Sequence, residues 1–127
     1  MGFPKAQINK SLVAYTISYS KTENGVELKT TTNSPSINNP YYITISSNEN
    51  RGKIVVSNKN IMEDLIIDFT YIYREKDDEN TNYWFLTNPL VFDAVYVSNS
   101  NWNDVLFITL KKDSKNEVTL RYTIAKK

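Results

Sequence analysis

The segment YTISYSKTENGVELKTTT (residues 15–32) decides the fold class, because apolar and polar residues alternate on both sides of a turn signal. Tyr15, Ile17 and Tyr19 alternate with threonine and serine, a period of two that predicts a half-buried strand. Asn24-Gly25 follows, and both residues suit the positive φ that a type I′ hairpin turn requires. The segment therefore predicts an antiparallel hairpin.

The same period of two continues along most of the chain. Residues 64–75 are expected to form one central strand, because a helix would place Asp68 and Thr70 among its apolar positions. Turn signals recur at the spacing typical of sandwiches and of barrels, which share this pattern. We therefore expect an all-β protein, a single antiparallel β-sandwich of about nine strands that forms one domain over residues 1–127. Further strands are expected at residues 41–47, 52–57, 83–86, 90–97, 105–110 and 118–124.

Composition excludes several classes of active site. The 127 residues include no histidine and no cysteine, which excludes catalytic triads, cysteine nucleophiles, the usual zinc sites, histidine-ligated haem and disulfides. The net charge is +1, whereas nucleic-acid-binding proteins usually carry a clear basic excess. We expect no enzyme activity, no cofactor, no metal and no nucleic-acid partner.

Residues 92–106 contain the candidate site. The segment predicts a strand, an asparagine-rich loop with Trp102, and a second strand. An indole flanked by amides and hydroxyls is typical of a recognition surface, because it places a flat apolar face beside hydrogen-bond partners. Tyr96 and Tyr122 are expected on neighbouring strands, where with Trp102 they would form an aromatic patch suited to sugar faces or choline-type cations. The candidate ligand-binding residues are Tyr96, Ser98, Asn99, Asn101, Trp102, Asn103 and Tyr122.

Each candidate also has a structural interpretation. Trp102 could cap an edge of the core instead of contacting a ligand. Trp84 is expected to pack, because one of the two faces of its strand must lie in the core. Asp93 lies between Val91 and Val95 on one strand face. It is therefore either paired with an arginine in a buried site or exposed at a rim.

The same loop segment resembles a known family. It is similar to the aromatic membrane-contact segment of actinoporin-type cytolysins in Tyr96, Ser98, Asn99, Asn101, Trp102 and Asn103. Residues 118–124, together with Asn88-Pro89, resemble the aegerolysins, and the fungal fruit-body lectins look like relatives of the same sandwich. The resemblance implies a β-sandwich that binds phosphocholine-type lipid headgroups or carbohydrate, with contacts from Tyr96, Ser98, Trp102 and Tyr122. Residues 1–10 show no counterpart of the amphipathic actinoporin helix, so a helical pore is not expected.

The sequence therefore predicts a non-enzymatic, lectin-like module that binds a glycan or a phosphocholine-type lipid headgroup. Such modules often act as homo-oligomers, because avidity compensates for weak single contacts. One alternative is a pore-forming toxin, or a subunit that docks on a membrane surface and acts with a partner toxin subunit. A second alternative is a structural protein of a virion, appendage or inclusion. The sequence shows no apolar run of signal-peptide or membrane-spanning length, so we expect a soluble protein, cytoplasmic in its producer or released without a classical signal.

Overall fold

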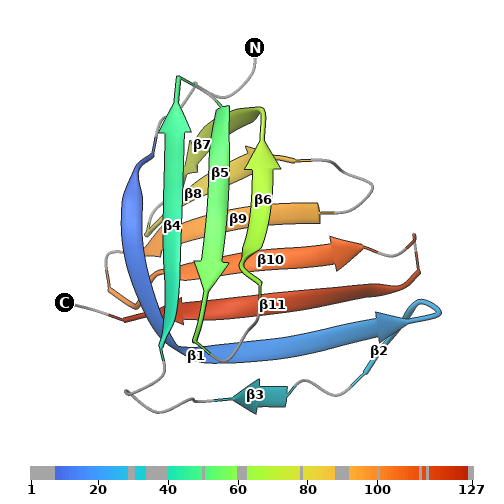
Figure 1. Ribbon diagram of the computed structural model, residues 1–127. Coiled ribbons are helices and arrows are strands. Elements are labelled where there is room, and N and C mark those ends of the chain that lie inside the picture. The colour runs from blue at the N-terminus through green and yellow to red at the C-terminus, as the bar shows by residue number, and fades with distance from the viewer. Residues whose placement is uncertain are drawn as a thin grey trace.

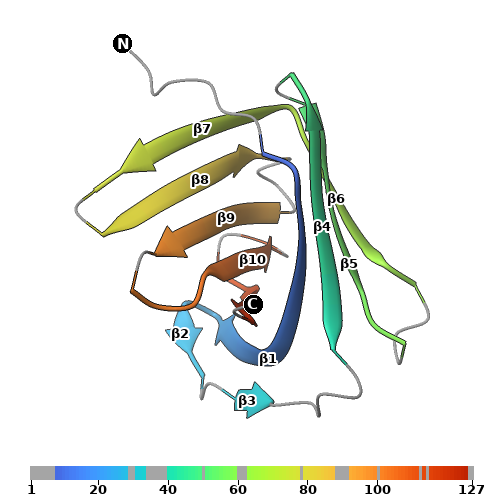
Figure 2. The same cartoon turned by 90° about the vertical axis from the view of Figure 1, so that its left-hand side faces the viewer.

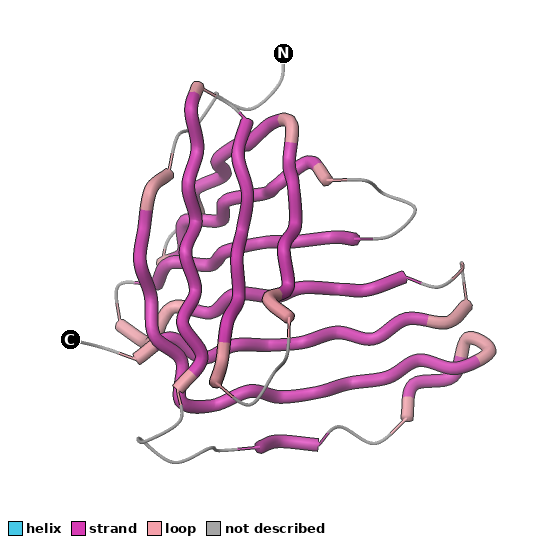
Figure 3. Tube along the Cα trace, viewed as in Figure 1, coloured by secondary structure: helices cyan, strands magenta, loops and turns pink. Residues whose placement is uncertain are grey.

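The computed structural model describes residues 8–28, 31–33, 40–49, 51–59, 63–77, 79–87, 92–99, 101–111, 113 and 115–125. They form strands joined by turns (Figures 1 and 3). Within these ranges, no helix has the length and apolar character that crossing a bilayer requires. The strands are β1 (Lys10–Glu23), β2 (Val26–Glu27), β3 (Thr31–Asn33), β4 (Tyr41–Asn48), β5 (Arg51–Ser57), β6 (Leu65–Phe69), β7 (Tyr71–Lys76), β8 (Asn80–Leu86), β9 (Phe92–Asn99), β10 (Val105–Lys111) and β11 (Glu117–Ile124).

The strands belong to one antiparallel sheet with the order β6-β5-β4-β1-β11-β10-β9-β8-β7, to which β2 and β3 are added by pairing with β1. In Figure 1, β4, β5 and β6 run across the strands β7 to β11, which lie behind them. Figure 2 shows the sheet curling from β6 round to β7, so that it is nearly closed into a barrel. The all-β prediction is confirmed. The sandwich is not confirmed, because one continuous sheet supplies both layers.

The first corner of the sheet lies in β1. The first half of this strand pairs with β4, and its second half pairs with β3 and β2. Along its other edge β1 pairs with β11, and the register shifts between Ala14 and Thr16. An irregularity of this kind bends a strand and increases its twist. Strand β1 thereby connects the layer of β4 with the layer of β11.

The second corner lies at Thr70, and it shows that the prediction of one central strand over residues 64–75 is wrong. The chain forms two strands, β6 and β7, which are the two ends of the sheet order. The N–H of Thr70 donates to the carbonyl of Leu86 at 3.0 Å. Ile67 and Phe69 are buried before the bend and Ile72 after it. The inward-facing side chains therefore stand at odd positions before the bend and at even positions after it. An unbroken strand would have buried the tyrosines of β7 instead.

The turn at Asn24-Gly25 forms as predicted. Asn24 has a φ of 52° and Gly25 a φ of 80°, and β2 returns along β1. The N–H of Asn24 also donates to Oδ1 of Asn116 at 3.0 Å, and that of Gly25 to the carbonyl of Lys115 at 2.9 Å. The turn is therefore attached to the connection between β10 and β11. The predicted hairpin of β4 and β5 is also confirmed, whereas the predicted return strand to Thr32 is divided into β2 and β3.

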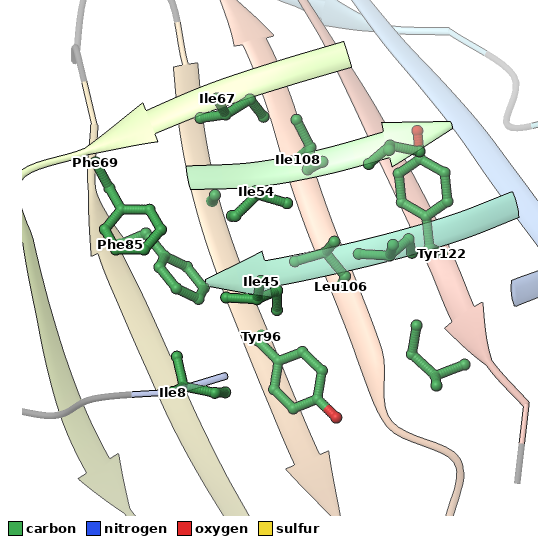
Figure 4. Packing of buried hydrophobic residues seen from close by; sticks show 14 of the residues in the cluster. Ile8, Ile45, Ile54, Ile67, Phe69, Phe85, Tyr96, Leu106, Ile108 and Tyr122 are labelled. Atoms are coloured by element: carbon green, nitrogen blue, oxygen red, sulfur yellow. The ribbon is translucent and has the colours of Figure 1, made fainter. Parts of the chain in front are cut away.

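The core lies between the two layers of the sheet. Figure 4 shows Ile45, Ile54 and Ile67 of the front layer against Leu106 and Ile108 of the back layer. Alternation along each strand places one set of side chains inside, as expected for a period of two. The buried apolar residues are Ile8, Ala14, Ile43, Ile45, Ile54, Val56, Ile67, Phe69, Ile72, Phe85, Ala94, Tyr96, Leu106, Ile108, Tyr122 and Ile124.

Candidate functional site: the Trp102 loop

Asn99 shapes the loop between β9 and β10. We call Asn99 together with residues 101–104 the Trp102 loop. The Oδ1 of Asn99 accepts hydrogen bonds from the N–H of Asn101 at 2.7 Å and of Trp102 at 2.8 Å, a turn that asparagine side chains commonly make. The Nδ2 of Asn99 donates to Oδ1 of Asn80 on β8. Both ends of the Asn99 amide are therefore used to build the loop.

Asp104 holds the other end of the loop. Its Oδ1 accepts the N–H of Asn99 at 3.2 Å, and its Oδ2 accepts the hydroxyl of Tyr96. Its backbone carbonyl accepts the N–H of Ile124 at 2.9 Å. The Nδ2 of Asn103 donates to the carbonyl of Ile124 at 2.8 Å. These bonds attach the Trp102 loop to β9 and β11 in addition to β8, and so they hold it in one conformation.

Tyr96 and Tyr122 do not join Trp102 in the expected aromatic patch. Their side chains are 0% and 3% exposed, because positions 96 and 122 face the core (Figure 4). The ring of Tyr96 packs edge-on against Tyr83 with centroids 6.1 Å apart, and that of Tyr122 against Tyr41 at 5.7 Å. The expectation of a surface patch is therefore corrected. A period of two predicts that these residues alternate with their neighbours, but the core can lie on either face.

Burial raises the pKa of both tyrosine hydroxyls above their ordinary value of 10.0. For Tyr96, loss of hydration is the main cause, and the hydrogen bond to Asp104 and the negative charge of that carboxylate raise the pKa further. For Tyr122, loss of hydration is again the main cause, with a smaller contribution from Tyr41. Both hydroxyls are neutral at physiological pH. The Tyr96 hydroxyl donates from the core to Asp104 and so stabilises the Trp102 loop.

Trp102 is 70% exposed, the largest value among the described large hydrophobic residues. Asn101 and Asn103 beside it are exposed as well, and no described residue donates to the Oδ1 of Asn103. Ser98 is half-buried, at a position of β9 that faces the same side of the sheet as Tyr96. The structure therefore brings Asn99, Asn101, Trp102 and Asn103 together in one loop, and it places Ser98, Tyr96 and Tyr122 on the inner side of the sheet.

Sequence reasoning missed two features of this region. One is the structural role of Asp104, for which an acidic residue at the end of a loop gives only a weak signal. The other is the position of Trp84, which lies on the outer face of β8 while Phe85 is buried. Its ring stacks on Tyr73, with centroids 6.3 Å apart and planes 16° apart. Because β8 has consecutive aromatic residues, its sequence does not show which face is the core. No local signal could therefore have placed Trp84 on the outer face beside Tyr73.

The Trp102 loop is suited to surface contact rather than to proton transfer. The Asp104 carboxylate already accepts two hydrogen bonds, and its donor Tyr96 is buried with a raised pKa. Among the residues described, no three acidic side chains are grouped closely enough to hold a metal ion. The exposed residues of the loop are Asn101, Trp102 and Asn103, and the indole of Trp102 is the largest group among them.

Comparisons with known proteins do not extend this picture, because no family model, curated protein or solved structure matches the chain. The resemblance of residues 92–106 to the actinoporin-type cytolysins stays a prediction, as does the resemblance to aegerolysins and fungal fruit-body lectins. Function therefore has to be argued from the geometry of the site.

Proposed function

We propose that the protein is a non-enzymatic binding module that recognises carbohydrate through the indole of Trp102. The observation that carries this proposal is a ring with 70% exposure on a loop that hydrogen bonds attach to Asn80 of β8, Tyr96 of β9 and Ile124 of β11. Because these bonds already hold the loop, binding has little left to order in it, and the loop-ordering part of the entropic cost of association is small. The C–H face of a pyranose ring can stack on the indole while its hydroxyl groups stay hydrated.

A sugar suits the Trp102 loop better than a choline-type headgroup. Quaternary ammonium groups are bound by several aromatic rings arranged as a cage. Tyr96 and Tyr122 lie in the core, so among the described residues they supply no second wall beside Trp102. A single flat ring matches the apolar face of a sugar.

The roles of the asparagines follow from their contacts. Asn99 positions Trp102 and does not contact ligand, because both ends of its amide are bonded within the protein. Asn103 adjoins Trp102 in the chain, and a sugar hydroxyl can donate to its Oδ1. One stacked ring and few hydrogen bonds give weak affinity, so a homo-oligomer or a ligand with repeated sugars would raise the overall affinity by avidity.

The test is a screen of the purified protein on a glycan array, followed by titration of the best glycan. We expect Trp102→Ala to weaken binding about tenfold or more, since truncation removes both the stacking contact and its buried area. Tyr42→Ala is the matched control. Tyr42 is also an exposed aromatic residue, at 55%, but it lies on β4 in the other layer. Equal binding by Trp102→Ala and the unmodified protein would show that the Trp102 loop is not the site.

Membrane docking is the second candidate, and the exposure of Trp102 favours it too, because indole rings settle at the headgroup level of bilayers. Sedimentation with phosphatidylcholine vesicles, with dye release from the same vesicles, separates the two functions. Vesicle binding that is lost in Trp102→Ala, together with no binding to any glycan, would replace the carbohydrate proposal by a membrane-docking one.

A further inference from the structure

A row of large side chains crosses the outer face of the back layer. The strand registers pair Tyr73 with Trp84, Trp84 with Val95, Val95 with Phe107 and Phe107 with Arg121. Paired residues point to the same side of a sheet, and Phe85 and Ala94, which adjoin this row in β8 and β9, are buried inside. The row therefore lies on the outside of the sheet, over β7, β8, β9, β10 and β11.

Trp84 and Phe107 flank Val95 in this row. Each of the two rings contacts another side chain on the side away from Val95. Trp84 stacks on Tyr73, with planes 16° apart, so its other face is directed toward β9. The guanidinium of Arg121 lies over the ring of Phe107, 5.8 Å from its centroid, so the free face of Phe107 is also directed toward β9. Between them is a hollow of about 200 Å³, lined by Trp84, Asp93, Ala94, Val95, Phe107 and Thr109. We call this hollow the Trp84–Phe107 slot.

The spacing of the strands that carry the two walls favours a puckered ring over a flat one. Strands β8 and β10 are two positions apart in the sheet, so their backbones are roughly 9.5 Å apart. Rings that stand upright on these strands would be separated by a similar distance, with Val95 of β9 at the base between them. A flat aromatic ligand in contact with both walls would need them only about 7 Å apart, twice the closest favourable distance between carbon atoms. A pyranose chair is thicker, because its axial C–H bonds project from both faces. It can therefore contact Trp84 and Phe107 together.

One end of the slot is polar. Asp93 is paired with Thr109 across β9 and β10, and its carboxylate forms an ion pair with Nζ of Lys111 at 3.3 Å. This exposed position is the rim alternative expected for Asp93. Vicinal sugar hydroxyls can donate to a carboxylate and accept from an ammonium group. Lys111 offsets the charge of Asp93, and Arg121 adds a positive charge behind Phe107, so these groups do not attract a cationic ligand.

We propose that the Trp84–Phe107 slot is a second binding site, which takes a neutral pyranose between its two aromatic walls with the hydroxyls on Asp93, Thr109 and Lys111. The site shares no residue with the Trp102 loop, so it stands without the function proposed there. The Nε1–H of Trp84 is buried with no acceptor among the described residues, so Trp84 offers a ligand the face of its ring and not its N–H.

The chain has two tryptophans, so each site can be read separately by fluorescence. Trp102→Phe leaves Trp84 as the single tryptophan, and Trp84→Phe leaves Trp102; excitation at the red edge of the absorption band avoids the nine tyrosines. Both proteins are titrated with the methyl glycosides of glucose, galactose, mannose and N-acetylglucosamine, after circular dichroism has shown that they are folded. We expect at least one glycoside to produce a saturable change in Trp84 emission.

Asp93→Asn in the Trp102→Phe background tests the polar end of the slot. The Asp93 side chain is 61% exposed, so the substitution leaves the fold intact. We expect the affinity for the active glycoside to fall about tenfold, because the hydroxyls lose a charged acceptor. Asp68→Asn, an exposed carboxylate on β6 in the other layer, is the matched control and should leave the affinity unchanged.

Three results would overturn the slot. The first is no change in Trp84 emission with any glycoside. The second is an equal affinity in Asp93→Asn and Asp68→Asn. The third is a response of Trp84 to adenosine, to tetramethylammonium or to protein concentration in place of sugar, which would make the hollow a site for a flat base, a cation or a second copy of the chain. In the first case, a glycoside response seen only in Trp84→Phe would support the Trp102 loop.

Discussion

The two tryptophans of the chain are held in opposite ways. Trp102 stands on a loop that is shaped by hydrogen bonds from Asn99 and Asp104, both within three positions of it, and its ring is free of aromatic neighbours among the described pairs. Trp84 is carried by a strand, and its ring rests on Tyr73 and faces a hollow toward Phe107. The first arrangement is built from local polar groups, and the second from side chains that only the sheet brings together.

This difference corrects a common inference from sequence. Asparagines around an exposed aromatic residue suggest hydrogen bonds to a ligand, yet the Asn99 amide and the Nδ2 of Asn103 are bonded within the protein. Backbone groups of an irregular loop need partners, and short polar side chains nearby are the ones that supply them. On the sheet the backbone groups are paired by the neighbouring strands. Side chains there are not needed by the backbone. Thr109 bonds to the hydroxyl of Thr119 and Asp93 to Lys111, and the lone pairs that these bonds leave can serve a ligand.

The largest expected effect is a loss of folding stability on substitution of Asp104 in the Trp102 loop, compared with Asp93 in the Trp84–Phe107 slot. Asp104→Ala leaves the Tyr96 hydroxyl and the Asn99 N–H without their acceptor. We expect the free energy of unfolding to fall by about 3 kcal/mol, because each buried donor left unpaired costs about 1–3 kcal/mol. Urea unfolding followed by circular dichroism measures the loss. Asp93→Ala is the control and should cost less than about 1 kcal/mol, since its ion pair is on the surface. Similar losses in the two variants would contradict the supporting role of Asp104.

The next effect is alkaline destabilisation, and it involves the support of the Trp102 loop. In the unfolded chain Tyr96 ionises near its ordinary pKa of about 10, whereas the pKa of the folded residue is higher. The unfolded state therefore loses its proton first as the pH rises. The contribution of Tyr96 to the free energy of unfolding is fully present below pH 10. Above that pH the free energy of unfolding falls by up to about 1.4 kcal/mol per pH unit for Tyr96, with a similar fall from Tyr122.

Urea unfolding at a series of alkaline pH values tests this prediction. Tyr96→Phe removes one ionisable group and should reduce the slope of stability against pH above pH 10 by about half, whatever its effect on stability at neutral pH. An unchanged slope in that variant would mean that Tyr96 ionises as readily in the folded protein as in the unfolded chain.

The smallest expected effect is that of Trp102→Ala on stability. A ring with 70% exposure gives up little contact when it is removed, so the free energy of unfolding should change by less than about 0.5 kcal/mol. Trp84→Ala should cost more, because its ring packs on Tyr73. Thermal unfolding of the two variants side by side measures the difference. A clear loss of stability in Trp102→Ala would indicate that the ring packs against the edge of the core and has a structural role instead of a ligand-binding one.

Much of the fold was predictable from local patterns. The Asn24-Gly25 turn and the hairpin of β4 and β5 form as predicted, because alternation and turn residues act within a few positions of one another. The bend at Thr70 was not predictable. It depends on a hydrogen bond to Leu86, sixteen residues along the chain, and on a sheet that is nearly closed between β6 and β7.

The candidate site was predictable only in part. The exposure of Trp102 agrees with a polar, asparagine-rich loop, whereas the burial of Tyr96 and Tyr122 does not follow from their spacing. Each strand has two faces with similar aromatic content, and only the partner strands decide which one meets the core. For the same reason the sequence did not show that Trp84 and Phe107 lie on either side of Val95 on one face of the sheet.

The sequence by itself determined that the chain is antiparallel and all-β, that its hairpins turn where asparagine and glycine permit, and that chemistry based on histidine or cysteine is excluded. These properties depend on residue type and on contacts between near neighbours. The tertiary structure alone decided that one sheet forms both layers, that Asn99 and Asp104 build the Trp102 loop, and that Trp84, Phe107 and Asp93 line one slot. Those outcomes depend on register between strands far apart in the chain, which is set by how the whole sheet buries its core.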